Sequence, residues 1–356
     1  MSGQLAETLR RAALRDPERR FHQLYDKLYR PDILGQAFER ACARGGRPSD
    51  YHRGRLEGEA KRLRSGTFRP GRAGFGDRVV EEALLLVLEP VLLPGWSFDA
   101  WGTVRALRDL LGCSGGPVAA FTVRPDRDGI LDLLELRIAD RRLLTLVRAF
   151  LASGPSPDVL DFGLLHVPRL GGGLGSLLAE YRLAAWERGL ALPDRVVRGG
   201  NEVVLVGTPM ERVFAEIPVP EARPVDPYAE SFVFLGFSWH KRRGTGEAVF
   251  QPDRKAVLAV RSRIGEITRG KTHLELGAMV EKVNRPLAGW GAYYRICPNR
   301  AAMKKIDGYV RERLAIWSAR KHSRSGPGLG RPEVSRTGLR EVGLVELGKL
   351  PPARWD

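Results

Sequence analysis

The chain has 356 residues, of which 43% are hydrophobic, so its length suggests two or three domains with their own cores. Its longest apolar stretch, residues 81–96, contains Glu89 and two prolines, which excludes a membrane-spanning helix. The three cysteines are isolated and the N-terminus is polar, which excludes a metal-binding cysteine pattern and predicts a cytoplasmic protein.

The net charge of +16 is unevenly distributed along the chain. Residues 238–356 contain 25 Lys and Arg against 11 Asp and Glu, whereas residues 1–237 contain 33 against 31. A basic region that is interleaved with aromatic residues predicts a polyanion partner. We expect this partner to be nucleic acid.

The first half of the chain is predicted to be mostly helical. Hydrophobic periodicity and capping residues predict helices over 4–66 (with a turn at 45–50), 79–92, 97–112, 140–154 and 171–190. Alternation predicts a strand over 117–126.

Residues 195–207 predict a β-hairpin. Gly199, Gly200 and Asn201 tolerate positive φ and lie between two runs of valine. Asn201 and Glu202 then lie at the tip. They form a working polar site, the remains of one, or simply a turn.

The second half is predicted to begin with a connector, because residues 215–230 contain four prolines. A strand is expected over 232–240. A helical region follows over 254–322, broken at 284–289 and 297–299, and the tail after it is rich in Gly, Pro and Arg.

Three motifs occur in order in the basic region: FVFLGFSWHKRR at 232–243, NRPLAGWGAYYR at 284–295 and IDGYVRERLAIWSARKH at 306–322. They resemble the C-terminal part of group II intron-encoded reverse transcriptase/maturase proteins. That family has a Phe-Leu-Gly-Phe strand, a thumb-like maturase domain with Asn-Pro-x-x-x-Gly-Trp-x-x-Tyr-Tyr-Arg, and a final Trp-x-x-Arg-Lys-His helix. The second motif here has one extra residue, Arg285, between Asn284 and Pro286.

The resemblance extends more loosely over the front of the chain. Residues 125–132 are similar to the strand that carries the family's catalytic aspartate, which falls on Asp126, and residues 171–180 are similar to its Gln-Gly-Gly-Val-Leu-Ser-Pro-Leu-Leu-Ala-Asn segment. The resemblance implies an α/β (α+β) fold. Its expected parts are a reduced reverse-transcriptase-like fingers and palm domain at 1–237, a helical maturase-type thumb domain at 238–322 and a basic tail at 323–356.

The resemblance fails where the family carries out polymerase chemistry. The family's hairpin reads Arg-Tyr-Ala-Asp-Asp, and the same frame here reads Arg198-Gly199-Gly200-Asn201-Glu202. Two Mg²⁺ ions need a closely placed carboxylate set. Asn201 is neutral, and Glu202 is one methylene longer than aspartate. Asp126 and Glu202 are left as weak metal-ligand candidates, and no cofactor is expected unless the polymerase is active.

Two further departures agree with this loss. Only Arg72 is left of the basic finger segment that holds the triphosphate in the family, and the segment between Glu202 and Phe232 is proline-rich where the family has a palm helix. We therefore expect no polymerase activity.

Aromatic and basic side chains predict where RNA binds, because rings stack on bases and guanidinium groups pair with phosphates. Trp290 is expected in the core, whereas Tyr294 and Arg295 are expected to reach RNA, and the HKRR segment at 240–243 is expected to be exposed. The last helix is expected to carry a basic stripe. The candidate RNA-binding residues are Lys241, Arg242, Arg243, Tyr294, Arg295, Lys304, Lys305, Arg313, Arg320 and Lys321.

The expected function is that of an RNA-binding, maturase-like protein that assists the folding or splicing of a structured RNA of group II intron type. A contact with DNA through the basic tail is a further expectation, and no membrane partner is expected. Two alternatives stay open: a divergent but active RNA-directed DNA polymerase, and a decaying remnant of a mobile element without a function.

Overall fold

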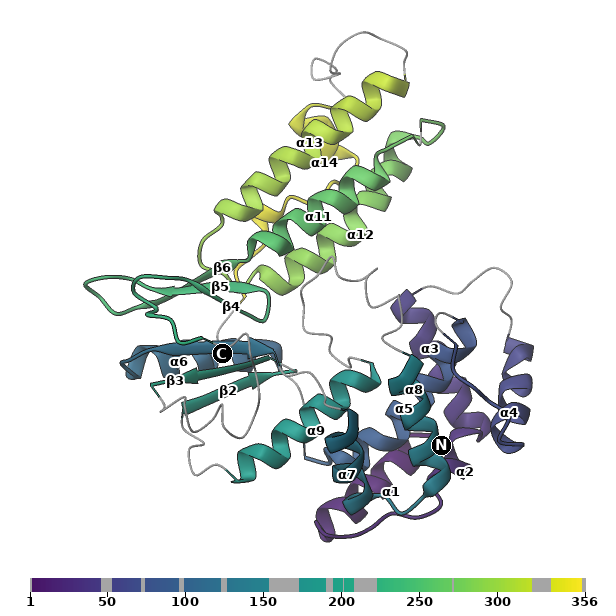
Figure 1. Cartoon of the computed structure of the whole chain (residues 1–356). Helices are drawn as coiled ribbons and strands as arrows, with labels where there is room; N and C mark the ends of the chain where they lie inside the picture. Colours follow the sequence, from purple (N-terminus) through teal and green to yellow (C-terminus); the bar gives the residue numbers. More distant parts are fainter. Residues whose placement is uncertain are drawn as a thin grey trace.

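The structure is a computed structural model. It describes residues 2–45, 53–71, 74–95, 99–122, 127–153, 173–189, 195–200, 202–207, 223–270, 272–321 and 334–353. Helices predominate, with two small antiparallel sheets between an N-terminal and a C-terminal group of helices (Figure 1). This mixture agrees with the predicted α+β class.

The N-terminal helices pack around one apolar helix, α5 (Phe75–Leu92), which is buried along most of its length. Its first turn is capped because the Gly74 N–H donates to the Asp77 carboxylate at 3.1 Å. Pro90 lies in the last turn. The surrounding helices are α1 (Ser2–Arg15), α2 (Tyr25–Leu28), α3 (Pro31–Gly45), α4 (Leu56–Arg64), α7 (Arg127–Arg137), α8 (Arg141–Ser153) and α9 (Leu174–Gly189).

The first sheet contains the predicted hairpin. Its strands β1 (Val118–Thr122), β2 (Val196–Gly199) and β3 (Glu202–Val206) lie in the order β1-β3-β2, all antiparallel. Helix α6 (Ala100–Cys113) packs on one face, and Leu183 of α9 packs on the other. The hairpin is thus confirmed, with Gly199 opposite Glu202. Residues 127–132, expected in a strand by similarity, instead begin helix α7.

The second sheet corrects the prediction of one strand over 232–240. The segment forms two strands, β4 (Phe232–Phe234) and β5 (Phe237–Lys241), and β5 also pairs with β6 (Ala248–Pro252). Leu235 and Gly236 form the turn, with φ of 53° and 72°. Leucine rarely adopts such a φ, so the local sequence did not reveal the turn.

The C-terminal helices are α11 (Arg254–Ile267), α12 (Leu276–Tyr294) and α13 (Ala301–Lys321). The predicted break at 297–299 is confirmed, but the one at 284–289 is wrong, because α12 continues through Pro286. A proline removes one N–H donor, while Val283, Leu287 and Trp290 keep this helix anchored in the core. The chain breaks instead over 268–275, where Gly270 has a φ of 71°.

Residues 334–353, which we name the strap, lie against α12 and α13 rather than extending away as a tail (Figure 1). The strap contains α14 (Arg336–Glu341) and the 3-10 turn η6 (Leu347–Lys349). Leu339 and Leu347 are buried in the same core as Trp290. The strap has three Lys or Arg residues and two Glu residues, so this part of the predicted tail is folded and only slightly basic.

One hydrophobic core runs from α6 and the first sheet through β4–β6 into the C-terminal helices and the strap. It crosses the domain boundary expected at residue 237, which therefore stays a prediction. Within the described ranges, no helix combines the length and the apolar character that a membrane span requires.

Candidate nucleic-acid interface

The tip of the β2–β3 hairpin is in contact with the turn of the neighbouring hairpin. The Leu235 N–H donates to Oε2 of Glu202 at 2.7 Å. A Cβ atom added at Gly199 would lie 2.6 Å from Leu235 Cδ2, so only glycine allows this close approach. Leu235 therefore packs directly against Gly199, the position at which the family that this chain resembles has a tyrosine.

Helix α12 holds the same turn from the other side. Tyr293 donates to the Leu235 carbonyl at 2.9 Å, and Tyr294 donates to the Gly236 carbonyl at 3.3 Å. Burial raises the pKa of both tyrosine hydroxyls, which keeps them as donors. The prediction that Tyr294 reaches out to RNA is wrong, because its side chain is fully buried. The half-buried Arg295 stacks on Trp101, 5.0 Å from the ring centroid.

Glu202 is thus a partly buried acceptor for a backbone N–H. Burial raises the pKa of its carboxyl, partly offset by the hydrogen bond from Leu235. No cluster of three His, Cys, Asp or Glu side chains suited to a metal occurs in the described part of the chain. Asp126 and Asn201 lie outside the described residues.

The raised pKa of Glu202 predicts a pH-dependent stability. A carboxyl with a raised pKa binds its proton more readily in the folded state, so its destabilising effect appears as pH rises from the unfolded pKa through the folded one. Glu202→Gln keeps an acceptor for Leu235 but cannot ionise. We expect the melting temperature of the wild type, relative to this variant, to fall as the pH rises from about 4 toward neutrality.

This expectation is checked by thermal melts of both proteins across that range. The exposed Glu247, paired with Arg242 at 2.8 Å, provides the matched control through Glu247→Gln. If the melting temperatures of the wild type and Glu202→Gln change with pH in the same way, the raised pKa of Glu202 is contradicted.

The basic segment after β5 is only partly exposed. Lys241 is buried, and its Nζ donates to the carbonyls of Leu111 at 2.7 Å and Ser114 at 3.0 Å, which caps the C-terminus of α6. The expectation that Lys241 is exposed is therefore wrong. Arg242 and Arg243 are exposed.

The basic residues of α13 do not form one continuous stripe. Lys304, Lys305 and Arg320 are exposed, as predicted. Arg313 instead donates to Thr268 Oγ1 at 3.2 Å and to the Gly265 carbonyl at 3.4 Å. Lys321 donates to the Leu274 carbonyl at 2.8 Å and to Glu275 at 3.1 Å. These last two side chains therefore hold α13 against the segment between α11 and α12.

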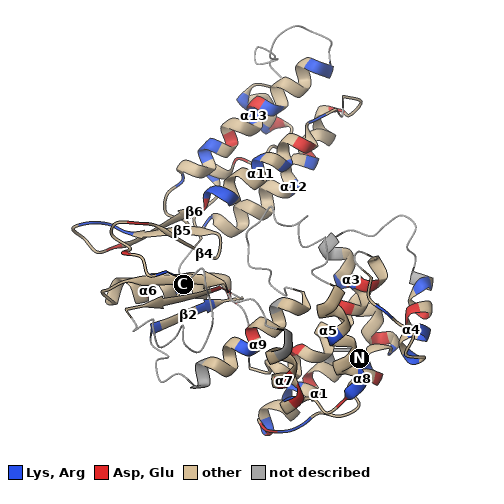
Figure 2. Cartoon of the chain, in the orientation of Figure 1, with Lys and Arg blue, Asp and Glu red and all other residues tan. Residues whose placement is uncertain are grey.

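Helix α11 contributes basic residues that the sequence reasoning did not select. Figure 2 shows Lys and Arg along both α11 and α13. The Arg261 guanidinium lies 4.4 Å from the ring centroid of Tyr309 on α13. The seven-residue spacing of Arg254 and Arg261 on α11 was the available signal, and Arg269 follows just after the helix ends. We define the α11–α13 face by Arg254, Arg261, Arg269, Lys305, Tyr309, Arg313 and Arg320.

The comparison with known proteins concerns the same helices. No curated protein matches the chain. Residues 257–332 match the family model described as "Group II intron, maturase-specific domain". The match contains α12 and α13 and nearly all of α11. The C-terminal part of the chain is therefore similar to the maturase-specific domain of group II introns.

Proposed function

We propose that the protein binds structured RNA of the group II intron type through the α11–α13 face and assists the folding or splicing of that RNA. The observation that carries this proposal is the coincidence of two features. The maturase-specific match covers residues 257–332, and the exposed cations Arg261, Lys305 and Arg320 belong to the same helices. Exposed cations on rigid helices suit the phosphate backbone of RNA, and a ring paired with a guanidinium offers a surface for an unstacked base.

We further propose that the protein does not polymerise DNA. Glu202 is occupied by the Leu235 N–H, and Gly199 is in close contact with the Leu235 side chain. Asn201 supplies no charge at the position where the family has an aspartate. A pair of Mg²⁺ ions needs carboxylates aimed at one point, and this arrangement directs Glu202 toward the backbone instead.

RNA binding is tested with the full chain and two labelled RNAs of equal length, a group II intron domain and a transfer RNA. Tighter binding of the intron domain supports the maturase-like function. Equal binding of both RNAs favours the remnant, because basic protein surfaces bind any RNA weakly.

Primer extension on an RNA template is expected to yield no product with Mg²⁺ or Mn²⁺. Replacing both hairpin positions with aspartate (Asn201→Asp and Glu202→Asp) is expected not to restore synthesis, since the Leu235 turn still packs against the tip. Templated incorporation that disappears on Asp126→Ala would instead support the active polymerase.

A further inference from the structure

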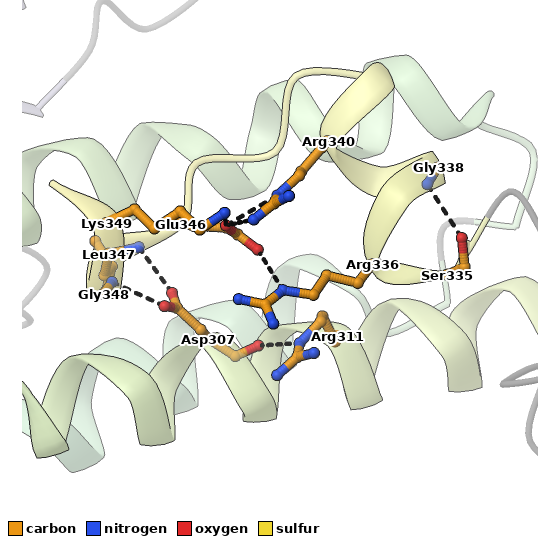
Figure 3. A network of polar contacts seen from close by, with 10 residues as sticks. All are labelled: Asp307, Arg311, Ser335, Arg336, Gly338, Arg340, Glu346, Leu347, Gly348 and Lys349. Carbon is orange, nitrogen blue, oxygen red and sulfur yellow. Dashed lines mark hydrogen bonds and ion pairs between the residues drawn. The ribbon is translucent and has the colours of Figure 1, made fainter.

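The strap is held against α12 and α13 by side chains that bind its backbone, and Figure 3 shows the contacts made by Asp307 of α13. The Asp307 carboxylate accepts the N–H groups of Leu347 and Gly348, each at 2.8 Å. The Asn284 side chain donates to the Gly343 carbonyl and accepts the Val345 N–H, both at 2.9 Å. The strap is thus a defined part of the fold, with side chains in fixed places.

This docking gathers cations around one carboxylate. Glu346, whose side chain is 12% exposed, contacts Arg336 at 3.0 Å, Arg340 at 2.8 Å and Lys349 at 2.9 Å. Arg311 of α13 lines the same small hollow as Arg336 and Arg340. We name Arg311, Arg336, Arg340 and Lys349 the strap cluster.

The strap cluster contains more cations than there are carboxylates in contact with it or lining the same hollow. Its four cations face two carboxylates, Glu346 and Asp307, which leaves a surplus of two positive charges. The three side chains around Glu346 remain 59%, 43% and 53% exposed, so they cover the carboxylate and face solvent. Exposed ion pairs contribute little to stability, and surplus like charges repel one another, so fold stability alone does not account for the surplus.

The position of the strap cluster extends the basic surface around α13. Asp307 and Arg311, four residues apart, lie on one side of the helix and contact or line the strap. Tyr309 and Arg313, also four residues apart, contact α11 on another side. The helix α13 therefore runs between two cationic flanks.

We propose that the strap cluster binds a phosphate of the RNA backbone, as a second contact site beside the α11–α13 face. Guanidinium groups match phosphate geometry and offer several donors each, so Arg336 and Arg340 can contact Glu346 and a phosphate together. This inference rests on the proposed function, because it assumes that the C-terminal helices bind RNA.

The test measures the salt dependence of affinity for a labelled RNA hairpin with the full chain. Replacing Arg336 and Arg340 with Gln is expected to reduce the slope of log affinity against log salt by about 0.7 to 0.9, the value for the loss of one phosphate contact. Replacing both with Lys is expected to keep most of the slope. Lys349→Gln removes one exposed charge and is expected to reduce the slope by at most about 0.9.

Glu346→Gln provides a gain-of-affinity test that misfolding cannot imitate. Removing this carboxylate raises the net charge of the strap cluster, so RNA affinity is expected to rise by up to about fivefold, as for a unit charge near a phosphate in water. Arg108→Gln and Arg223→Gln are the controls, because the side chains of both arginines reach solvent, at 36% and 70% exposed, and each is paired with a carboxylate elsewhere. The controls are expected to leave the slope and the affinity unchanged.

The possible results distinguish a failure of the strap-cluster proposal from a failure of the proposed RNA-binding function. Wild-type protein that binds no RNA hairpin would refute the proposed function itself. Wild-type binding with unchanged slopes in folded Arg336→Gln/Arg340→Gln and Lys349→Gln proteins, and unchanged affinity in Glu346→Gln, would refute the strap cluster alone. If the Arg336→Gln/Arg340→Gln protein does not fold, the slope of Lys349→Gln and the affinity of Glu346→Gln decide whether the strap cluster binds RNA. Tighter binding of duplex DNA of equal length would show that the site prefers DNA.

Discussion

The RNA affinity of the full chain is expected to fall about 10³-fold when salt rises from about 50 to 200 mM, if about six phosphates are neutralised. The physical reason is the release of counterions from RNA as cations on the protein take their place. Residues 238–356 carry the 25 Lys and Arg against 11 Asp and Glu that make this possible. Fluorescence anisotropy with a labelled intron-domain RNA at several salt concentrations measures the slope of log affinity against log salt.

The same measurement locates the contacts. Replacing Arg254, Arg261, Lys305 and Arg320 with Gln is expected to reduce the slope of log affinity against log salt by up to about the contribution of four phosphate contacts. The matched control replaces four exposed basic residues of the N-terminal helices, Arg10, Arg11, Arg141 and Arg148. Equal flattening by the control set would contradict the α11–α13 face. The full chain is required, because the shared core would be cut in a fragment that begins at 238.

Leu347→Ala is expected to destabilise the protein by about 2 to 5 kcal/mol, the range for a buried leucine. Leu347 is fully buried, and it packs so closely on α12 that a Cβ atom at Gly291 would lie 2.7 Å from its Cδ2. Truncation leaves a cavity between the strap and α12. Urea unfolding of the full chain measures the loss.

The matched control is Val342→Ala, also in the strap but 38% exposed. Its effect is expected to stay within about 0.5 kcal/mol. A Leu347→Ala protein as stable as the Val342→Ala protein would show that the strap does not complete the core.

Periodicity and turn chemistry predicted much of the fold. The apolar stripe of α8, a capped start for α6 and the Gly199-Gly200 turn each depend on neighbours in sequence, and each occurs in the structure. The burial of Trp290 followed from its helical spacing with Tyr293 and Tyr294 in the same way. Features determined by short-range geometry were therefore accessible from the sequence.

Features determined by distant partners were not accessible. Lys241 is buried because it caps a helix 130 residues earlier. Leu235 adopts a positive φ because Glu202 and Tyr293 hold its N–H and carbonyl. Neither contact leaves a local pattern. The sequence selected Lys305, Arg313 and Arg320 of the α11–α13 face, but it also placed Lys241 and Tyr294 at the surface, and both are buried.

The docking of the strap has a consequence for the order of folding during synthesis. The hydrogen bond of Asn284 cannot form until Gly343, 59 residues later, has been synthesised. The hydrogen bond of Asp307 likewise requires Leu347, 40 residues later. At about 5 to 20 residues per second, the first interval takes about 3 to 12 s. During that time α12 exposes the face around Gly291 that the strap later covers. The packing of α12 and α13 is therefore completed only after the strap has been synthesised, and the apolar face around Gly291 is open to non-native contacts during that interval.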